Sequence, residues 1–329
     1  MKLLRGGLMA GLSLASLLVG APRALAATVS AGDADGAPHL LTELQFNSTT
    51  AMASTTAATS TTPQTLASIP SRLIGTPGWI IGAQKGGSIG VQATSGPAGT
   101  PVYALEGSYP LPGAGGQYLW ADYSIANLNT EDVYIEFWAK MSGVPGGCKF
   151  LKIFGDSTTS SGHARATFGT DYTAADPGGI LQVMFGDGTD LRNDGQNVIK
   201  LNGSNPQFIG RSYGTAVVNT PQMTGFSSAD WGTGWHHFLV HVKFNSGTTV
   251  HNEVPNGEFF LEIDGKVYVD ATGVYNRNPA NGPINYIELF GWAQTDPAPF
   301  QVWFDDVRIS TGGFVSQSLP NPPKGVAVQ

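Results

Sequence analysis

The sequence predicts an all-β protein, a jelly-roll sandwich of two antiparallel sheets. Glycine accounts for 44 of 329 residues and charged residues for only 12%, so few stretches carry the Glu, Lys, Ala and Leu that exposed helix faces need. Apolar and polar residues alternate along several segments, which puts successive side chains on opposite faces of a strand. Gly, Asn and Asp turns separate these segments at fairly regular spacing, as in sandwiches and barrels.

The amino-terminal segment has the three parts of a secretory signal peptide. Lys2 and Arg5 supply positive charge, and residues 8–20 form an apolar run. That run is too short to cross a bilayer core of roughly 30 Å. Ala24-Leu25-Ala26 then offers a small-x-small cleavage site. We therefore expect a signal peptide over residues 1–26 and a secreted mature protein, extracellular or periplasmic, with no membrane span.

Residues 27–329 have no repeat and no clear boundary, so we expect a single β-sandwich domain. A Ser/Thr-rich stretch at 48–65 has no apolar period and is predicted to be a loop. The candidate strands of the first half are 39–46, 72–81, 90–94, 101–105 and 117–123.

The alternation becomes regular from Asp132 onward. In segment 133–141, Val133 and every second residue after it form an apolar face, which is expected to be core. Segments 149–154, 180–185, 235–245, 258–264, 286–292 and 300–310 continue the series, and Gly265 marks a hairpin turn into 266–269. The opposite, polar faces carry Tyr134, Glu136, Trp138 and Lys140 on one strand, Trp235, His237, Leu239, His241 and Lys243 on a second, and Phe260 and Glu262 on a third.

Composition argues against a nucleic-acid partner and excludes an internal disulfide. A net charge of −7 leaves no basic surface to replace phosphate counterions, so a nucleic-acid partner is not expected. Cys148 is the single cysteine, which excludes an internal disulfide, and it is expected to be a small buried side chain.

Four segments together carry a family resemblance: Trp235-His236-His237, Val242 to Asn245, Phe260 to Lys266, and Phe304 to Ser310. Their order resembles the closing half of concanavalin-A-like lectin/glucanase domains, especially the polysaccharide-lyase-like branch, over roughly residues 130 to 315. The resemblance implies a curved sheet whose concave face binds a polysaccharide. The residues that it implies for substrate binding are Tyr134, Glu136, Trp138, Lys140, Gln182, Lys243 and Glu262.

Cleavage of a uronic-acid polymer by β-elimination needs a group that neutralises a carboxylate and a base that removes the adjacent proton. His241, His237 and Lys149 are the catalytic candidates. Lys149 and Lys152 are expected on opposite faces of their strand, so only one would reach a groove. The alternative is that the histidines line a polar surface of a non-catalytic carbohydrate-binding or cell-surface structural module. A laminarinase-type hydrolase motif, Glu-x-Asp-x-x-Glu, would need Glu where Val267 stands.

The expected chemistry requires no cofactor. The segment 190–195 fails as an EF-type calcium loop, because Arg192 stands where an oxygen ligand is needed. Asp305 and Asp306 are the candidates for a structural Ca²⁺, as acidic terminal strands of similar jelly rolls suggest.

Overall fold

Strands of alternating burial build the protein, as the computed structural model shows for the ranges that it describes. These are residues 38–46, 64–65, 73–74, 79–83, 86–95, 101–110, 117–125, 128–142, 148–155, 165–170, 181–185, 197–201, 207–209, 222–226, 230, 234–246, 254–274, 276, 283–293 and 299–315. The expected signal peptide and all of the 48–65 loop except residues 64–65 lie outside them.

The first sheet is ten-stranded and antiparallel in every pairing given for it, with the strand order β14-β17-β16-β15-β8-β20-β1-β3 and a further pair, β6 and β5, on β20. Its members are β14 (Gln222–Met223), β17 (Lys266–Val274), β16 (Gly257–Ile263), β15 (His236–Lys243), β8 (Asp132–Met141), β20 (Phe300–Thr311), β1 (His39–Phe46), β3 (Leu73–Ile74), β6 (Pro101–Tyr109) and β5 (Ser88–Ser95).

The second sheet is also ten-stranded, with the order β13-β12-β11-β10-β9-β18-β7-β4-β2 and β19 paired with β7. Its members are β13 (Gln207–Ile209), β12 (Asn197–Lys200), β11 (Leu181–Phe185), β10 (Arg165–Thr170), β9 (Lys149–Phe154), β18 (Tyr286–Leu289), β7 (Gln117–Ser124), β4 (Trp79–Ala83), β2 (Gln64–Thr65) and β19 (Trp292–Ala293).

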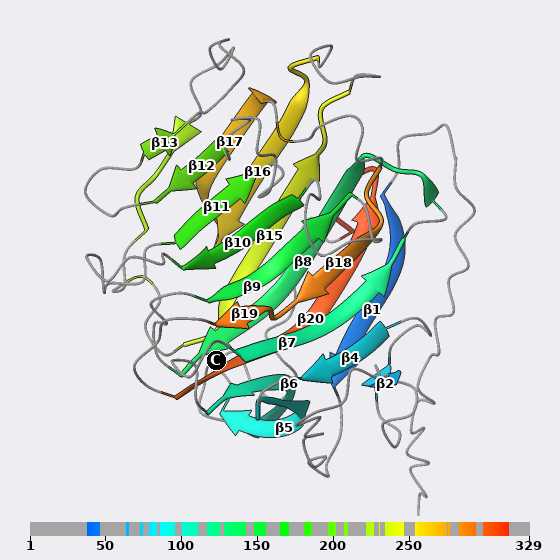
Figure 1. Ribbon diagram of the computed structural model, residues 1–329, viewed down its shortest axis with the longest axis vertical. Helices are drawn as coiled ribbons and strands as arrows, with labels where there is room; N and C mark the ends of the chain where they lie inside the picture. Colours follow the sequence, from blue (N-terminus) through cyan, green and yellow to red (C-terminus); the bar gives the residue numbers. More distant parts are fainter. Residues whose placement is uncertain are drawn as a thin grey trace, which may run out of the picture.

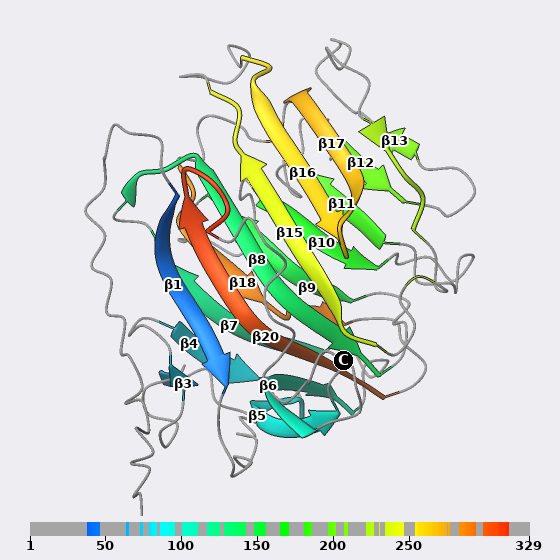
Figure 2. The same cartoon turned by 180° about the vertical axis from the view of Figure 1, so that it is seen from behind.

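The two sheets lie one over the other. The second sheet is in front in Figure 1 and the first sheet is in front in Figure 2. Aromatic rings from both inner faces meet between them. Phe137 and Phe238 of the first sheet stack with ring centroids 4.9 Å apart, and Phe150 of the second sheet meets Phe238 edge-on at 6.1 Å. The predicted sandwich of two antiparallel sheets is therefore confirmed.

Alternation predicted the inner faces well. Val133, Ile135, Phe137, Ala139 and Met141 are all buried in the core, and Cys148 is buried as expected. The expected hairpin is present, because Asp264 and Gly265 both have positive φ, 53° and 79°, which the tight turn between β16 and β17 requires.

Several strand boundaries differ from the predicted ones. Segment 72–81 forms two strands, β3 and β4, rather than one. Segment 286–292 is also divided, into β18 and β19. Strands β10, β12 and β13 were not predicted, and β2 lies at the end of the stretch predicted as a loop. Within the described ranges, no helix is both long and apolar enough to span a membrane.

Replacement of Phe137 by alanine tests the aromatic core. Phe137 is fully buried and contacts rings on two neighbouring strands, so Phe137→Ala should lower the free energy of unfolding by about 3–5 kcal/mol. Urea denaturation followed by tryptophan fluorescence measures this. Val267→Ala, at a position 42% exposed, is the control and should cost about 1 kcal/mol or less. Equal losses for the two variants would contradict the assigned core.

Candidate functional site

Cross-strand register brings most of the predicted binding residues onto one face of the first sheet. Tyr134 pairs with His241, Trp138 with His237, and Glu136 with Leu239, which in turn pairs with Glu262. Directly opposed residues of antiparallel strands project from the same side of the sheet. Tyr134, Glu136, Trp138, Lys140, His237, His241, Lys243 and Glu262 therefore share the outer face of the first sheet.

An ion pair and a histidine–carboxylate contact occupy the centre of this outer face. Glu136 and His237 are each 2% exposed, and Glu136 Oε1 lies 3.2 Å from His237 Nε2. The same carboxylate lies 3.6 Å from Arg308 Nη1. Burial opposes the charge of Arg308, but its hydrogen bond to Glu43 and the nearby carboxylates of Glu43, Asp306 and Glu136 together outweigh this and raise the pKa of the guanidinium. The sequence predicted a wet surface at Glu136; the side chain is instead buried, because Arg308 and His237 flank it.

A second pairing occupies His241. Its Nε2 lies 2.7 Å from Asp132 Oδ1, and its ring stacks on Tyr134 with centroids 4.1 Å apart. Burial and the nearby carboxylates of Asp132 and Glu258 raise the pKa of Tyr134 to about 12. Phe314, beyond the end of β20, packs edge-on against the Tyr134 ring. Lys243 donates to Glu258 at 2.8 Å.

Trp138 belongs to an aromatic group with Trp235 and Trp303 at the other end of this face. The Lys140 ammonium lies 4.7 Å from the Trp303 ring centroid and donates to Thr94 Oγ1. Trp303 is only 8% exposed, and its indole N–H donates to Glu106. Packing within this group covers part of Trp138, which the resemblance implied for substrate binding.

The other two predicted residues lie on the second sheet. Gln182 is paired with Gly169 and Lys200, and its side chain lies outside the described residues. Lys149 begins β9 between the buried Cys148 and Phe150, so its side chain projects to the outer side of the sheet. Phe150 and Leu151 both enter the core. This irregularity places Lys149 and Lys152 on the same side, so the prediction of opposite faces was wrong.

Asp305 and Asp306, the expected calcium ligands, lie at an irregularity of β20. Asp305 is buried, Asp306 has a φ of 47°, and the Asp306 N–H donates to Asp305 Oδ1 across a bulge in β20. No group of three His, Cys, Asp or Glu side chains gathers around them or elsewhere in the described ranges. A structural Ca²⁺ at Asp305 and Asp306 therefore stays a prediction.

A polar cluster that the sequence did not predict lies on the outer face of the second sheet. Asp122 of β7, Glu288 of β18 and Lys152 of β9 stand side by side in register. The Glu288 carboxylate accepts hydrogen bonds from the Tyr118 hydroxyl and the Lys152 ammonium. Glu288 and Lys152 are buried, with side chains 1% and 6% exposed. We call Tyr118, Asp122, Lys152 and Glu288 the Glu288 cluster.

Asp122 is the unpaired member of the Glu288 cluster. The residue is partly exposed, yet its Oδ1 is buried and has no hydrogen-bond partner among the described residues. Burial, with the adjacent Glu288 carboxylate, raises the pKa of Asp122 from 3.8 to about 8, against the opposing effect of Lys152. Burial and Glu288 also raise the pKa of Tyr118, so the phenol keeps its proton.

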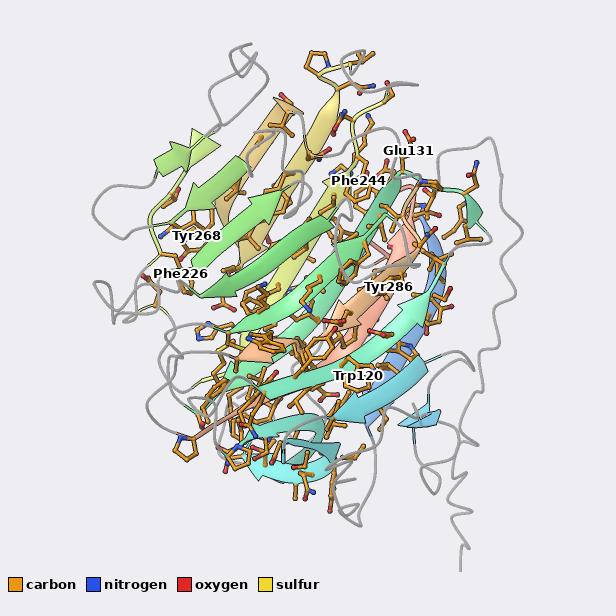
Figure 3. All side chains as sticks on the ribbon, in the orientation of Figure 1. Trp120, Glu131, Phe226, Phe244, Tyr268 and Tyr286 are labelled. Carbon is orange, nitrogen blue, oxygen red and sulfur yellow. The ribbon has the colours of Figure 1, made fainter. Side chains whose placement is uncertain are left out.

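Aromatic rings surround the Glu288 cluster. Trp120 and Tyr118 stack with centroids 5.2 Å apart, and Trp292 lies 6.2 Å from Tyr118. Phe154 stacks on Tyr286 beside them. Figure 3 labels Trp120 on β7 and Tyr286 on β18, in the view in which the second sheet is nearest to the reader.

A strained backbone turn supports this arrangement. Phe290 and Gly291, between β18 and β19, have φ values of 66° and 150°. A positive φ is unfavourable for a phenylalanine and marks a position whose surroundings impose it. The Gly291 carbonyl accepts from the Tyr109 hydroxyl, while Phe290 enters the core. Trp292 is thereby paired with Tyr118 on the outer side.

The sequence held one partial signal for this cluster. Asp122, Lys152 and Glu288 are polar residues at strand positions flanked by apolar ones, but they are separated by as many as 166 positions, from 122 to 288. A single sequence does not show that β18 lies between β7 and β9. The register that joins these three strands supplied the missing information.

Comparison with known proteins gives structural matches only. No protein-family model matches the sequence, and no curated protein matches it. The chain is similar to the endo-β-1,4-glucuronan lyase from the fungus Trichoderma reesei, with 14% identity and a TM-score of 0.43 over 70% of this chain and 90% of the lyase. It is similar to alginate lyase vAL-1 from Chlorella virus, with 13% identity and a TM-score of 0.42 over 67% and 88%.

A toxin domain is also similar, the botulinum neurotoxin serotype C1 binding domain. It is 11% identical, with a TM-score of 0.38 over 74% of this chain and 47% of the toxin chain. With TM-scores below 0.5, these likenesses assign no activity to this chain.

The raised pKa of Asp122 predicts how stability depends on pH. Between about pH 4 and pH 8 the folded chain holds a proton that the unfolded chain has released, so stability should fall as pH rises through this window. Asp122→Asn removes the titration. The free energy of unfolding of the variant should exceed that of the parent by an amount that grows by up to about 1.4 kcal/mol per pH unit.

Urea denaturation from pH 4 to pH 9 measures this difference. Asp270→Asn, on an exposed position of the first sheet, is the matched control for the exchange of aspartate for asparagine. A constant difference between Asp122→Asn and the parent at all pH values would show that Asp122 does not hold this proton.

Proposed function

We propose that the protein is an exported, concanavalin-A-like β-sandwich that recognises a polysaccharide on the outer face of the second sheet, at the Glu288 cluster. The features of residues 1–26 support export, and the absence of a boundary supports a single domain over 27–329. The acidic net charge supports a glycan rather than a nucleic acid as partner.

One observation carries this proposal. A buried carboxylate, an ammonium group and an unpaired carboxyl lie on an outer sheet face among aromatic rings, rather than in the core. Sugars offer apolar ring faces that stack on aromatic side chains, and hydroxyl groups that need donors and acceptors. Ligand sites combine an apolar lining with a few placed polar groups in this way, and perturbed pKa values gather at such sites.

The two sheet faces can be distinguished by their tryptophans. Trp292→Ala should weaken glycan affinity at least about tenfold, because tryptophan is enriched among the binding residues whose truncation costs about 2 kcal/mol or more. Trp138→Ala, on the first sheet, should leave the affinity within about twofold. A glycan array followed by calorimetry on the best ligand measures both. A loss confined to Trp138→Ala would move the site to the face that the sequence predicted.

Cleavage of a uronic-acid polymer by β-elimination is the second candidate function. Tyr118 is the candidate proton donor for the leaving oxygen, because its phenol is protonated and would exchange its hydrogen bond to Glu288 for one to that oxygen. Lys149, predicted as a catalytic residue, projects from the same side of β9 as Lys152. His237 and His241 remain the predicted bases of the other face, where each is paired with a carboxylate.

Ultraviolet absorbance of the unsaturated product tests cleavage directly. We expect absorbance to increase when the protein is incubated with at least one polymer from a panel of polyuronates, and Tyr118→Phe should lower the rate at least about 100-fold if the phenol is the proton donor. Trp138→Ala is the control and should keep the parent rate. Saturable binding without absorbance on any polymer would leave a carbohydrate-binding or cell-surface structural module.

A further inference from the structure

We propose that Asp122 is the residue of the Glu288 cluster that contacts the ligand, and that its protonated carboxyl donates a hydrogen bond to a carboxylate of an acidic glycan. This inference rests on the proposed function and specifies the ligand of that site. It names a binding residue and the chemical class that it selects.

Position singles out Asp122 within the cluster. Glu288 and Lys152 are enclosed, and Glu288 already accepts from both Lys152 and Tyr118. Asp122 is the cluster carboxyl that is partly exposed, and its Oδ1 has no partner in the described part of the chain. A buried, unpaired oxygen on a charged carboxylate is costly, whereas a protonated carboxyl lowers that cost and gains a donor.

The surroundings of Asp122 favour the neutral form. Glu288 stands directly across from it on β18, with Tyr286 two residues away, and Lys152 lies one strand further on. Tyr118 is the ionisable neighbour on its own strand. On the other side, β4 places Ile80 opposite Asp122, which brings no charge. The formal charges of Glu288 and Lys152 cancel, so Asp122 decides the net charge beside the ligand.

The hydrogen-bond donor and the neutral charge of protonated Asp122 together select an anionic ligand. A protonated Asp122 is a donor toward a carboxylate, and hydrogen bonds to an ionised acceptor are the stronger kind. An ionised Asp122 would be acceptor-only and would repel a second carboxylate. A neutral sugar hydroxyl, in contrast, can donate to an ionised Asp122 as readily as it accepts from a protonated one. Loss of affinity at high pH therefore distinguishes an acidic glycan from a neutral one.

The experiment compares binding at pH 6 and pH 9 for the parent, Asp122→Asn and Asp122→Ala. The probes are oligosaccharides of alginate, polyglucuronate and polygalacturonate, with the carboxyl-reduced form of each. Because the pKa of Asp122 is about 8, roughly a tenth of the carboxyl stays protonated at pH 9, so the parent should bind the best uronate about tenfold more weakly there than at pH 6.

Asp122→Asn keeps a donor and loses the titration, so it should bind equally at both pH values. Asp122→Ala should bind weakly at both, and carboxyl-reduced probes should show no decrease at pH 9. Thermal melts at each pH establish that the variants are folded. A tenfold decrease in Asp122→Asn would overturn the inference while leaving glycan binding intact. Preference of the parent for the carboxyl-reduced probes would overturn it too, and absence of binding to every probe would overturn the proposed function itself.

Discussion

The entry of Phe290 into the core is the constraint on which the second sheet's outer face depends. Its ring packs edge-on against Phe304 of the first sheet, and a Cβ at Gly107 would lie 2.5 Å from it. Reaching that position requires a positive φ, which costs about 1–3 kcal/mol. Burying a phenylalanine contributes about 1.5–3 kcal/mol, enough to offset that strain. The register with β7 is the same on both sides of this turn, which keeps Glu288 and Trp292 on the outer side. Because Phe290 turns inward, its side chain does not cover the outer face between them.

The two outer faces differ in how their charges are balanced. On the first sheet, Glu136 is flanked by His237 and Arg308, and Lys243 by Glu258. The buried contacts of Glu136 add little net stability, because desolvation cancels most of the attraction. The pair of Lys243 and Glu258 is partly exposed, so solvent screening keeps its contribution small as well. On the second sheet, Lys152 balances Glu288, and Asp122 remains beside them without a partner among the described residues. The Asp122 carboxyl, which no described residue balances, favours the outer face of the second sheet as the ligand site.

Local alternation predicted the fold because the burial pattern of each strand follows from the apolar and polar residues of that strand alone. Phe137 and Phe238 occupy the positions that a period of two assigns to the core. Alternation also grouped Tyr134 with Glu136 and His237 with His241, and register then joined the two groups. It failed where the period breaks. At Phe150-Leu151 a register shift in β9 exchanges the faces of the residues beyond it. At Phe290 the ring turns inward with a positive φ, while the register with β7 continues unchanged. Both irregularities lie beside the Glu288 cluster, which explains why this cluster was missed.

Asp122 shows why this cluster is better explained by binding than by stability. A carboxyl whose pKa is raised by burial and a neighbouring carboxylate destabilises the folded chain wherever the unfolded chain would be ionised. The strain at Phe290 adds a second cost at the same place. An asparagine would fill the same volume and donate a hydrogen bond without the charge. What aspartate adds to asparagine here is a proton that titrates near neutral pH, so binding at this site depends on pH. A ligand that accepts a hydrogen bond from the protonated form would return part of the lost free energy on binding.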